Sequence, residues 1–350
     1  AGVESPIGVT LTVGICDTAS NGALCNGTEY GVGPTGETYA VHNLDPNASI
    51  QDAIDAADPA DLILVPPGVY DELVIMHKPV KLQGWGAGAV TLNARQVPTE
   101  KIANWRSAVQ NLVANGFIDL LPGQELAPTG FAALGAPLFP TEEGAGIFVA
   151  GSNQFPDWFK GLPNRGARID GFNIVGATQG GAIVVNGYAG YLSIGNNRMS
   201  GNAGFYGGGI RVGHPTLTHQ DPATDLLLYT DADNDNIRIH HNLVVKNGGI
   251  NADGVGGGIG LMTGADGYQV QQNWVCGNFS VGSGAGIGHL GFSDNGLIED
   301  NTIIFNESFS QATAESGGGI YVGGQPGLQL IDGFQVSPGT GTVSIDANLI

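Results

Sequence analysis

Glycine-rich clusters that each lead into an isoleucine recur along residues 144–350 and set the pattern of the chain. The isoleucines lie 36, 27, 49, 28 and 33 residues apart, at Ile147, Ile183, Ile210, Ile259, Ile287 and Ile320. Between them the apolar residues fall in short β-type runs broken by Gly and Asn, without helical periodicity. A repeat of about 20–50 residues is typical of stacked architectures. The pattern therefore predicts successive coils of short strands, with insertions at one corner of the coil.

A second motif lies between these clusters. It consists of an apolar residue, an Asn three positions later and another Asn five positions further on. The copies are Ile194, Asn197, Asn202; Ile239, Asn242, Asn247; Val270, Asn273, Asn278; Ile298, Asn301, Asn306; and a shortened Ile345, Asn348. Asn tolerates left-handed turns and can hydrogen-bond its equivalent in the next coil. We therefore predict an all-β fold, a right-handed parallel β-helix whose stacked coils share one core.

The N-terminal part of the solenoid carries its own signals. Ile50 and Ile54 have helical spacing and predict a short amphipathic helix, and residues 62–65 predict a buried strand that ends at a Pro-Pro-Gly turn. Together with the repeats, this region resembles the first coil of the pectin-lyase-like superfamily of right-handed β-helix proteins. The resemblance implies the fold and a helix that closes the end of the coil. The catalytic motifs of that superfamily's polygalacturonases, pectate lyases and alginate epimerases are absent, so no catalytic residue is carried over.

The chain divides into a cap and a solenoid. We expect residues 1–45 to form an N-terminal cap and residues 46–350 to form the β-helix. Insertions are expected at about 95–143, 151–167 and 215–236, the first of which begins with a helix. The last asparagine motif is incomplete. We therefore expect a further chain or domain to stack on the C-terminal coil.

Composition narrows the partners and the compartment. The chain has 12 Lys and Arg against 32 Asp and Glu, a net charge of −20, which argues against binding to nucleic-acid phosphates. No apolar run is long enough for a membrane span. Cys16 and Cys25 predict a disulfide and hence an extracellular, cell-surface or periplasmic location, with two free thiols as the alternative.

The alternation of strand side chains assigns candidate site residues. His240, Gln271 and Glu299 are expected to stack in one outward row, with Asp300 at the adjacent corner. Imidazole and carboxylate groups in one row suit general acid–base catalysis, with an ordinary solvated face as the alternative. The candidate catalytic residues are His240, Glu299, Asp300 and the outward-facing Arg211. The candidate substrate-binding residues are Gln271, Trp105, Trp158 and Tyr321.

Two further groups suggest metal ligands. Asp231, Asp233 and Asp235 alternate with other residues in one turn, a pattern that calcium uses and that a solvated acidic turn explains equally well. His214, His219, His240 and His241 lie on either side of the same insertion and are candidates for a transition-metal site. His289 falls in a core row, where we expect a buried, hydrogen-bonded histidine.

Three functions follow from these features. The first is an extracellular protein that binds or processes a polysaccharide. The second is a structural or adhesive component of a larger assembly, completed by a further chain. The third is a metal-binding component that uses the histidines. A fold alone does not choose between such functions.

Overall fold

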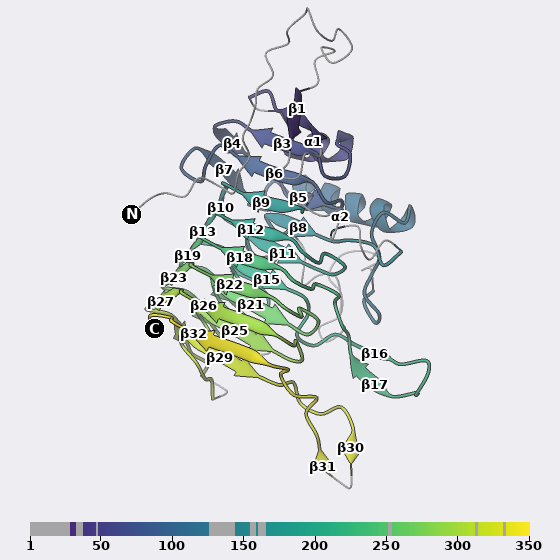
Figure 1. Ribbon diagram of the computed structural model, residues 1–350, viewed down its shortest axis with the longest axis vertical. Coiled ribbons are helices and arrows are strands. Elements are labelled where there is room, and N and C mark those ends of the chain that lie inside the picture. The colour runs from purple at the N-terminus through teal and green to yellow at the C-terminus, as the bar shows by residue number, and fades with distance from the viewer. Residues whose placement is uncertain are drawn as a thin grey trace, which may run out of the picture.

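The computed structural model describes residues 29–32, 38–46, 48–125, 144–154, 159, 166–250, 254–311, 314–331 and 334–350. These residues form a right-handed parallel β-helix whose strands stack coil upon coil along the long axis (Figure 1). A complete coil passes from sheet A to sheet B, then through the short sheet D to sheet C, and on to sheet A of the next coil. The predicted fold is confirmed.

Sheet A contains ten strands and is parallel except for the antiparallel pair β1–β2. Its strands are β1 (Glu29–Val32), β2 (Thr38–Asn43), β3 (Leu62–Val65), β6 (Lys81–Gly84), β9 (Arg168–Asp170), β12 (Ser193–Gly195), β18 (Arg238–His240), β22 (Gln269–Gln271), β26 (Gly296–Glu299) and β32 (Val343–Asp346). Of the predicted cap, residues 1–28 and 33–37 lie outside the described residues. The pair β1–β2 continues sheet A beyond β3.

The other faces of the coil are sheets B, C and D. Sheet B contains β4 (Gly68–Tyr70), β7 (Val90–Asn93), β10 (Asn173–Val175), β13 (Arg198–Ser200), β19 (Leu243–Val245), β23 (Trp274–Cys276) and β27 (Thr302–Ile304). Sheet C contains β5 (Val74–Met76), β8 (Ile147–Val149), β11 (Ile183–Val185), β15 (Ile210–Val212), β21 (Ile259–Met262), β25 (Ile287–Leu290) and β29 (Ile320–Gly323). Sheet D contains β14 (Ala203–Gly204), β20 (Gly248–Gly249), β24 (Phe279–Ser280) and β28 (Glu307–Ser308).

Two antiparallel hairpins leave the stack (Figure 1). The first pairs β16 (Thr218–Gln220) with β17 (Leu227–Tyr229), inside the insertion expected at 215–236. The second pairs β30 (Leu330–Ile331) with β31 (Phe334–Gln335). Much of the insertion expected at 151–167 lies outside the described residues.

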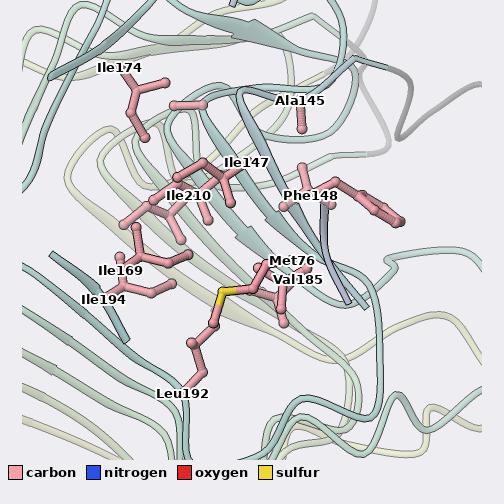
Figure 2. Close-up of a cluster of buried hydrophobic side chains, with 14 of the residues drawn as sticks. Met76, Ala145, Ile147, Phe148, Ile169, Ile174, Val185, Leu192, Ile194 and Ile210 are labelled. Carbon is pink, nitrogen blue, oxygen red and sulfur yellow. The ribbon is translucent and has the colours of Figure 1, made fainter. Parts of the chain in front are cut away.

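The repeated isoleucines fill the interior of the coil. Ile147 and Ile210 of sheet C are fully buried, and Figure 2 shows them in one cluster with Ile169, Ile174 and Ile194 of sheets A and B. Burial of such a side chain contributes about 1.5–3 kcal/mol to stability. One coil alone has no second layer to cover these groups, so the stack supplies the core.

Two asparagine ladders run along the corners. The first follows sheet A and the second follows sheet B; their members are Asn197, Asn242, Asn273, Asn301 and Asn348, then Asn202, Asn247, Asn278 and Asn306. From Asn242 and Asn247 onward, the Oδ1 atom of each Asn accepts the backbone N–H of its equivalent in the preceding coil at 2.9–3.2 Å. The ladders thereby satisfy buried backbone groups at the turns.

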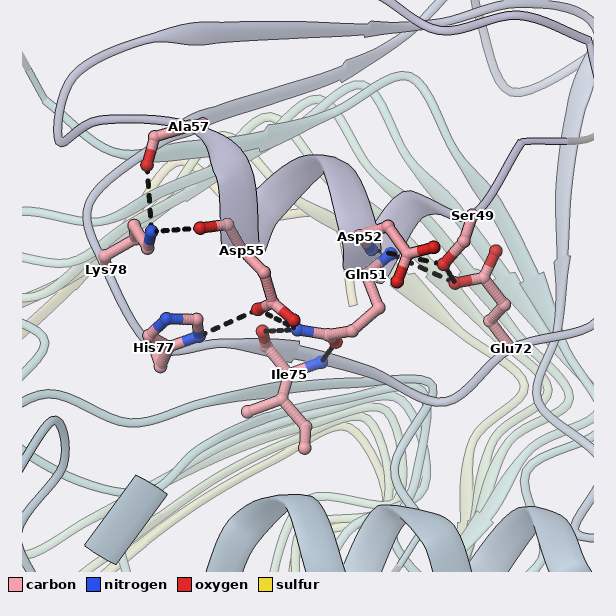
Figure 3. Close-up of polar contacts among 9 residues, drawn as sticks. All are labelled: Ser49, Gln51, Asp52, Asp55, Ala57, Glu72, Ile75, His77 and Lys78. Atoms are coloured by element: carbon pink, nitrogen blue, oxygen red, sulfur yellow. Dashed lines mark hydrogen bonds and ion pairs between the residues drawn. The ribbon is translucent and has the colours of Figure 1, made fainter. Parts of the chain in front are cut away.

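Helix α1 (Ile50–Ala56) closes the N-terminal end of the core, as predicted. Its N-cap Ser49 accepts the N–H of Asp52 through Oγ (Figure 3). Glu72 accepts the backbone N–H groups of Ile50 and Gln51 in the first turn. The side chain of Gln51 bonds both backbone groups of Ile75 in β5, at 2.7 and 3.1 Å. These contacts fix the helix on the first coil.

Helix α2 (Thr99–Ala114) lies where the sequence predicts it, within the insertion that begins at residue 95. Its Trp105 and Val109 are buried, and Trp105 packs edge-to-face against Phe148 of β8 with 5.4 Å between ring centroids. The helix therefore covers part of the outer face of sheet C (Figure 1).

Candidate functional site

A column of polar side chains crosses the outer face of sheet A. His240 pairs with Gln271, Gln271 with Glu299, and Glu299 with Asp346 in successive parallel strands. The apolar residue before each of the first three, Ile239, Val270 and Ile298, is fully buried, so these polar side chains point outward. The expected stacking of His240, Gln271 and Glu299 is therefore present. We call these residues and Asp346 the sheet A column.

Hydrogen bonds orient the middle of this column. Gln271 donates through Nε2 to Glu299 Oε2 at 2.9 Å, which links two successive coils through side chains. The bond leaves the side-chain amide oxygen of Gln271 and the second carboxylate oxygen of Glu299 for other partners. An amide and a carboxylate held on strands are well placed to bind the hydroxyl groups of a ligand.

His240 lies across the neighbouring strand. A Cβ at Gly195 would stand 2.5 Å from His240 Cε1, so the imidazole ring occupies space that any side chain at position 195 would fill. From there Nε2 lies 2.9 Å from Ser193 Oγ, and Nδ1 lies 3.1 Å from His241 Nδ1. Burial, with the neighbouring His241 and Arg238, lowers the pKa of His240 to about 4. His240 is therefore a neutral hydrogen-bonding group at physiological pH and a weak base.

The same face continues toward the N-terminus through residues that the sequence motifs missed. Asp170 pairs with Gly195, and it accepts a 2.8 Å hydrogen bond from Asn196 Nδ2. Burial raises the pKa of Asp170, against the opposing effects of Asn196 and Arg168. Arg168 donates to Gln83 on the next strand. Phe172 stands where later coils have the first ladder Asn, so the asparagine motif gave no signal here.

Arg211 does not belong to this face. It lies on β15 of sheet C and points away from the interior as expected, but it is only 1% exposed, so its assignment as an accessible catalytic residue is wrong. Its guanidinium carbon lies 5.7 Å from the ring centroid of Tyr206, which comes from the loop before β15. Further along this face, a Cβ at Gly288 would stand 2.6 Å from Val255 Cβ, so a second loop lies directly on the sheet. Loops cover the outer face of sheet C and remove Arg211 from solvent.

The aromatic residues expected to line a sugar site are dispersed. Trp105 is 3% exposed and packs in the core, so its assignment to substrate binding is wrong. Tyr321 lies on β29 of sheet C, beside the cluster of Tyr206, and not on the face of Gln271. Trp158 lies outside the described residues. Asp300 is exposed at the corner after β26, with a left-handed φ of 55°.

The acidic turn before β18 contains Asp235, and an Asp occupies the equivalent position in each of the next two coils. Asp235 accepts the N–H of Asp266 at 3.2 Å, and Asp266 accepts the N–H of Asp294 at 2.7 Å, one coil further each time. Burial, then the charges of Asp266 and Asp231, raise the pKa of Asp235 to about 6. The pKa of Asp233 is raised by burial and by the same two carboxylates. The signal in the sequence was an Asp followed by Asn or Gly ahead of the sheet A strands β18, β22 and β26.

The four histidines are not brought into one metal site. His214 Nε2 lies 3.3 Å from Gln124 Nε2, and His219 Nδ1 lies 2.9 Å from Thr230 Oγ1, whereas His240 faces His241. Within the part of the chain that the structure describes, no three His, Cys, Asp or Glu side chains form a group that could hold a metal ion. That finding covers the residues of the acidic turn as well.

The remaining sequence expectations concern single residues. His289 is buried as expected; one ring nitrogen lies 3.0 Å from Tyr268 Oη and the other within 3.0 Å of two backbone carbonyls. Cys16 and Cys25 lie outside the described residues, so their disulfide stays a prediction. Cys276 in β23 is a free thiol.

Comparison with known proteins adds little beyond the fold. No protein-family model matches the chain, and no curated protein matches it significantly. Among solved structures, the chain is similar to a family 28 exopolygalacturonase from Yersinia enterocolitica, with 10% identity over 92% of this chain and 70% of that chain. The TM-score of 0.19 is too low for this likeness to support a function. The architecture itself defines the class as a parallel β-helix protein. No helix in the described ranges is long and apolar enough to cross a membrane.

Proposed function

We propose that this protein is an extracellular, cell-surface or periplasmic β-helix of the pectin-lyase-like kind that binds a polysaccharide along the outer face of sheet A. The observation that carries the proposal is the placement of His240, Gln271 and Glu299 on three successive strands. Adjacent strands are about 4.8 Å apart, so the column offers one hydrogen-bonding group per coil. A polymer of hydroxyl-bearing units matches such a repeating series of donors and acceptors.

Processing of the bound polysaccharide is a separate part of the proposal. Glu299 and Asp346 are direct neighbours in register, and Asp300 follows Glu299 at the corner. Glycosidases act through two carboxyl groups, about 5–9.5 Å apart. We assign an acid–base role to Glu299 and Asp300, with His240 as a neutral hydrogen-bond partner because its pKa is about 4.

The test of the polysaccharide proposal is affinity gel electrophoresis against a panel of neutral and acidic polysaccharides. Gln271→Ala and Glu299→Gln are expected to weaken retention of the ligand that binds the wild type. Gln110→Ala and Glu100→Gln on the exposed side of α2 make the same chemical changes away from sheet A and should leave retention unchanged. Glu299→Gln that binds but no longer cleaves would separate turnover from binding. A wild type that binds no member of the panel would refute the proposal.

A further inference from the structure

Four exposed aromatic side chains come from two successive coils, on the flank formed by sheets B and D. They are Trp274, Phe279, Phe305 and Phe309, which are 48%, 38%, 84% and 52% exposed. Trp274 begins β23 and Phe279 begins β24 in one coil, while Phe305 directly follows β27 and Phe309 directly follows β28 in the next. We call these four residues the aromatic flank. Exposed aromatic side chains that gather on one flank are candidates for an interaction site.

Phe305 occupies a backbone position that disfavours it. Its φ is +57°, in the left-handed region that bulky residues avoid. In the four preceding coils the residue that follows the sheet B strand is Gly176, Gly201, Lys246 and Gly277 in turn. A strained and exposed phenylalanine where glycine is the usual residue adds nothing to the core. Such an outlier points to a role for the side chain in binding.

The charge around the aromatic flank differs from that of the whole chain. The outward residues of sheet B from β10 to β27 include no carboxylate; they are Asn173, Val175, Arg198, Ser200, Leu243, Val245, Trp274, Cys276, Thr302 and Ile304. Arg198 is exposed here, and so is Lys246 at the corner, while Glu307 of β28 lies opposite Phe279. The outward positions of these sheet B strands therefore carry Arg198 and no carboxylate, although the whole chain has a net charge of −20 and Asp300 and Glu307 border the face.

These observations together select the ligand. Aromatic faces carry negative potential and attract the C–H groups of a sugar ring, and lysine and arginine pair with carboxylate or sulfate groups. A second copy of the chain would bring another net charge of −20 and the same two cations against this surface, which opposes self-association. We propose that the aromatic flank binds an anionic glycan, with Phe305 and Trp274 as stacking platforms and Lys246 and Arg198 as the partners of the acidic groups. This inference rests on the proposed polysaccharide function and adds a second contact surface to it.

The fold offers variants that should keep the structure intact. Phe305→Gly and Lys246→Gly each install the residue that Gly201 and Gly277 supply at the same position of other coils. Trp274→Thr copies Thr302, its direct neighbour in sheet B. Phe334→Ala, on the exposed hairpin strand β31, removes an equally exposed aromatic ring elsewhere and serves as the control.

The experiment measures retention in gels that contain alginate, polygalacturonate or hyaluronate, and in gels with the carboxyl-reduced form of each. For the acidic glycan that retains the wild type, Phe305→Gly and Trp274→Thr should each lose about tenfold in affinity. Lys246→Gly should weaken binding and reduce its dependence on salt. The carboxyl-reduced form should bind more weakly than the acidic form, and Phe334→Ala should bind like the wild type.

Each other result has a definite meaning. If Phe305→Gly and Trp274→Thr bind the glycan unchanged while Gln271→Ala loses affinity, the proposal that the aromatic flank binds glycan is wrong. The proposal for sheet A would then still hold. Equal binding of acidic and carboxyl-reduced glycans would overturn the anionic ligand. A dimer in native mass spectrometry that Phe305→Gly converts to a monomer would make the occupant a second copy. A wild type that binds no glycan would refute the proposed function and this inference together.

Discussion

Asn242 and Asn273 occupy the same position in successive coils and are joined by two hydrogen bonds. The Oδ1 atom of Asn273 accepts both the backbone N–H and the side-chain Nδ2 of Asn242, each at 3.0 Å. Asn242 Nδ2 also donates to the carbonyl of Ile194 at 2.9 Å, in the coil before. One side chain thus ties three coils together, and both residues are almost fully buried. Regular geometry of this kind requires the same residue in each coil that the ladder joins.

Removal of one ladder asparagine should be costly. Asn242→Ala deprives the N–H of Asn197 of its acceptor and the carbonyl of Ile194 of a donor, at a corner where Asn242 is almost fully buried. Because each unsatisfied buried group costs about 1–3 kcal/mol, we expect a loss of roughly 3 kcal/mol in unfolding free energy. Urea unfolding followed by circular dichroism measures it. Gln272→Ala, at an exposed corner next to the same ladder, should change little; an equal effect of both variants would contradict the ladder's role.

The glycine clusters allow the coils to approach closely. A Cβ at Gly258 would stand 2.6 Å from the carbonyl oxygen of Gly286 in the next coil, a distance that the backbone cannot accommodate. Gly258→Ala should therefore lower the unfolding free energy by about 1–3 kcal/mol or more, because overpacking forces the strands apart. A Cβ at Gly88 meets nothing within 4 Å, so Gly88→Ala is the matched control. Equal thermal stability of the two variants would show that the close approach is unimportant.

The residues that fill the interior of the coil could be predicted from the sequence because they recur at a regular position in each repeat. Ile210 and Ile259 repeat at a fixed position, and burial of that position is a requirement in every coil. The sheet A column follows from the same register, since side chains alternate along each strand. Thus His240, Gln271 and Glu299 could be placed in one row without any structure.

The loops that cover the outside of the coil do not follow the sequence repeats. Arg211 does point away from the interior, as the alternation requires, but Tyr206 and the loop at Val255 enclose it. These loops differ in length and composition between coils, so no period reveals where they fold. Asp170 escaped notice for a related reason, because Phe172 interrupts the asparagine motif in that coil.

The carboxyl group of Asp235 should make stability depend on pH. Its pKa in the folded protein is raised to about 6, so the folded state holds a proton that the unfolded state releases at lower pH. The stability contribution is present in acid and is lost as the pH rises from about 4 through 6. Asp235→Asn retains an oxygen that can accept the N–H of Asp266 and should raise the Tm at pH 7.5 relative to wild type, but not at pH 4.

Asp294 should show the opposite dependence of stability on pH and serves as the comparison for Asp235. Hydrogen bonds from the Thr342 hydroxyl and backbone lower its pKa, so its contribution is present at neutral pH and is lost as the pH falls. Asp294→Asn should therefore lower the Tm at pH 7.5 or leave it unchanged. A fall in Tm for Asp235→Asn at pH 7.5 would show that its hydrogen bond outweighs the repulsion from Asp266.

His240 should stay neutral in moderately acidic solution, and this decides what it can do on sheet A. Burial and the neighbouring His241 and Arg238 lower its pKa to about 4, whereas an unfolded chain takes up the proton near its ordinary pKa of about 6.5. Stability that is present above pH 6.5 is therefore lost as the pH falls toward 4. The Cε1 proton of His240 in NMR spectra should titrate with a midpoint near 4, and His240→Gln should reduce the loss of Tm between pH 6.5 and 4. A midpoint near 6.5 would instead leave the imidazole free to act as a general base, and the catalytic role of this residue would then be favoured over simple hydrogen bonding.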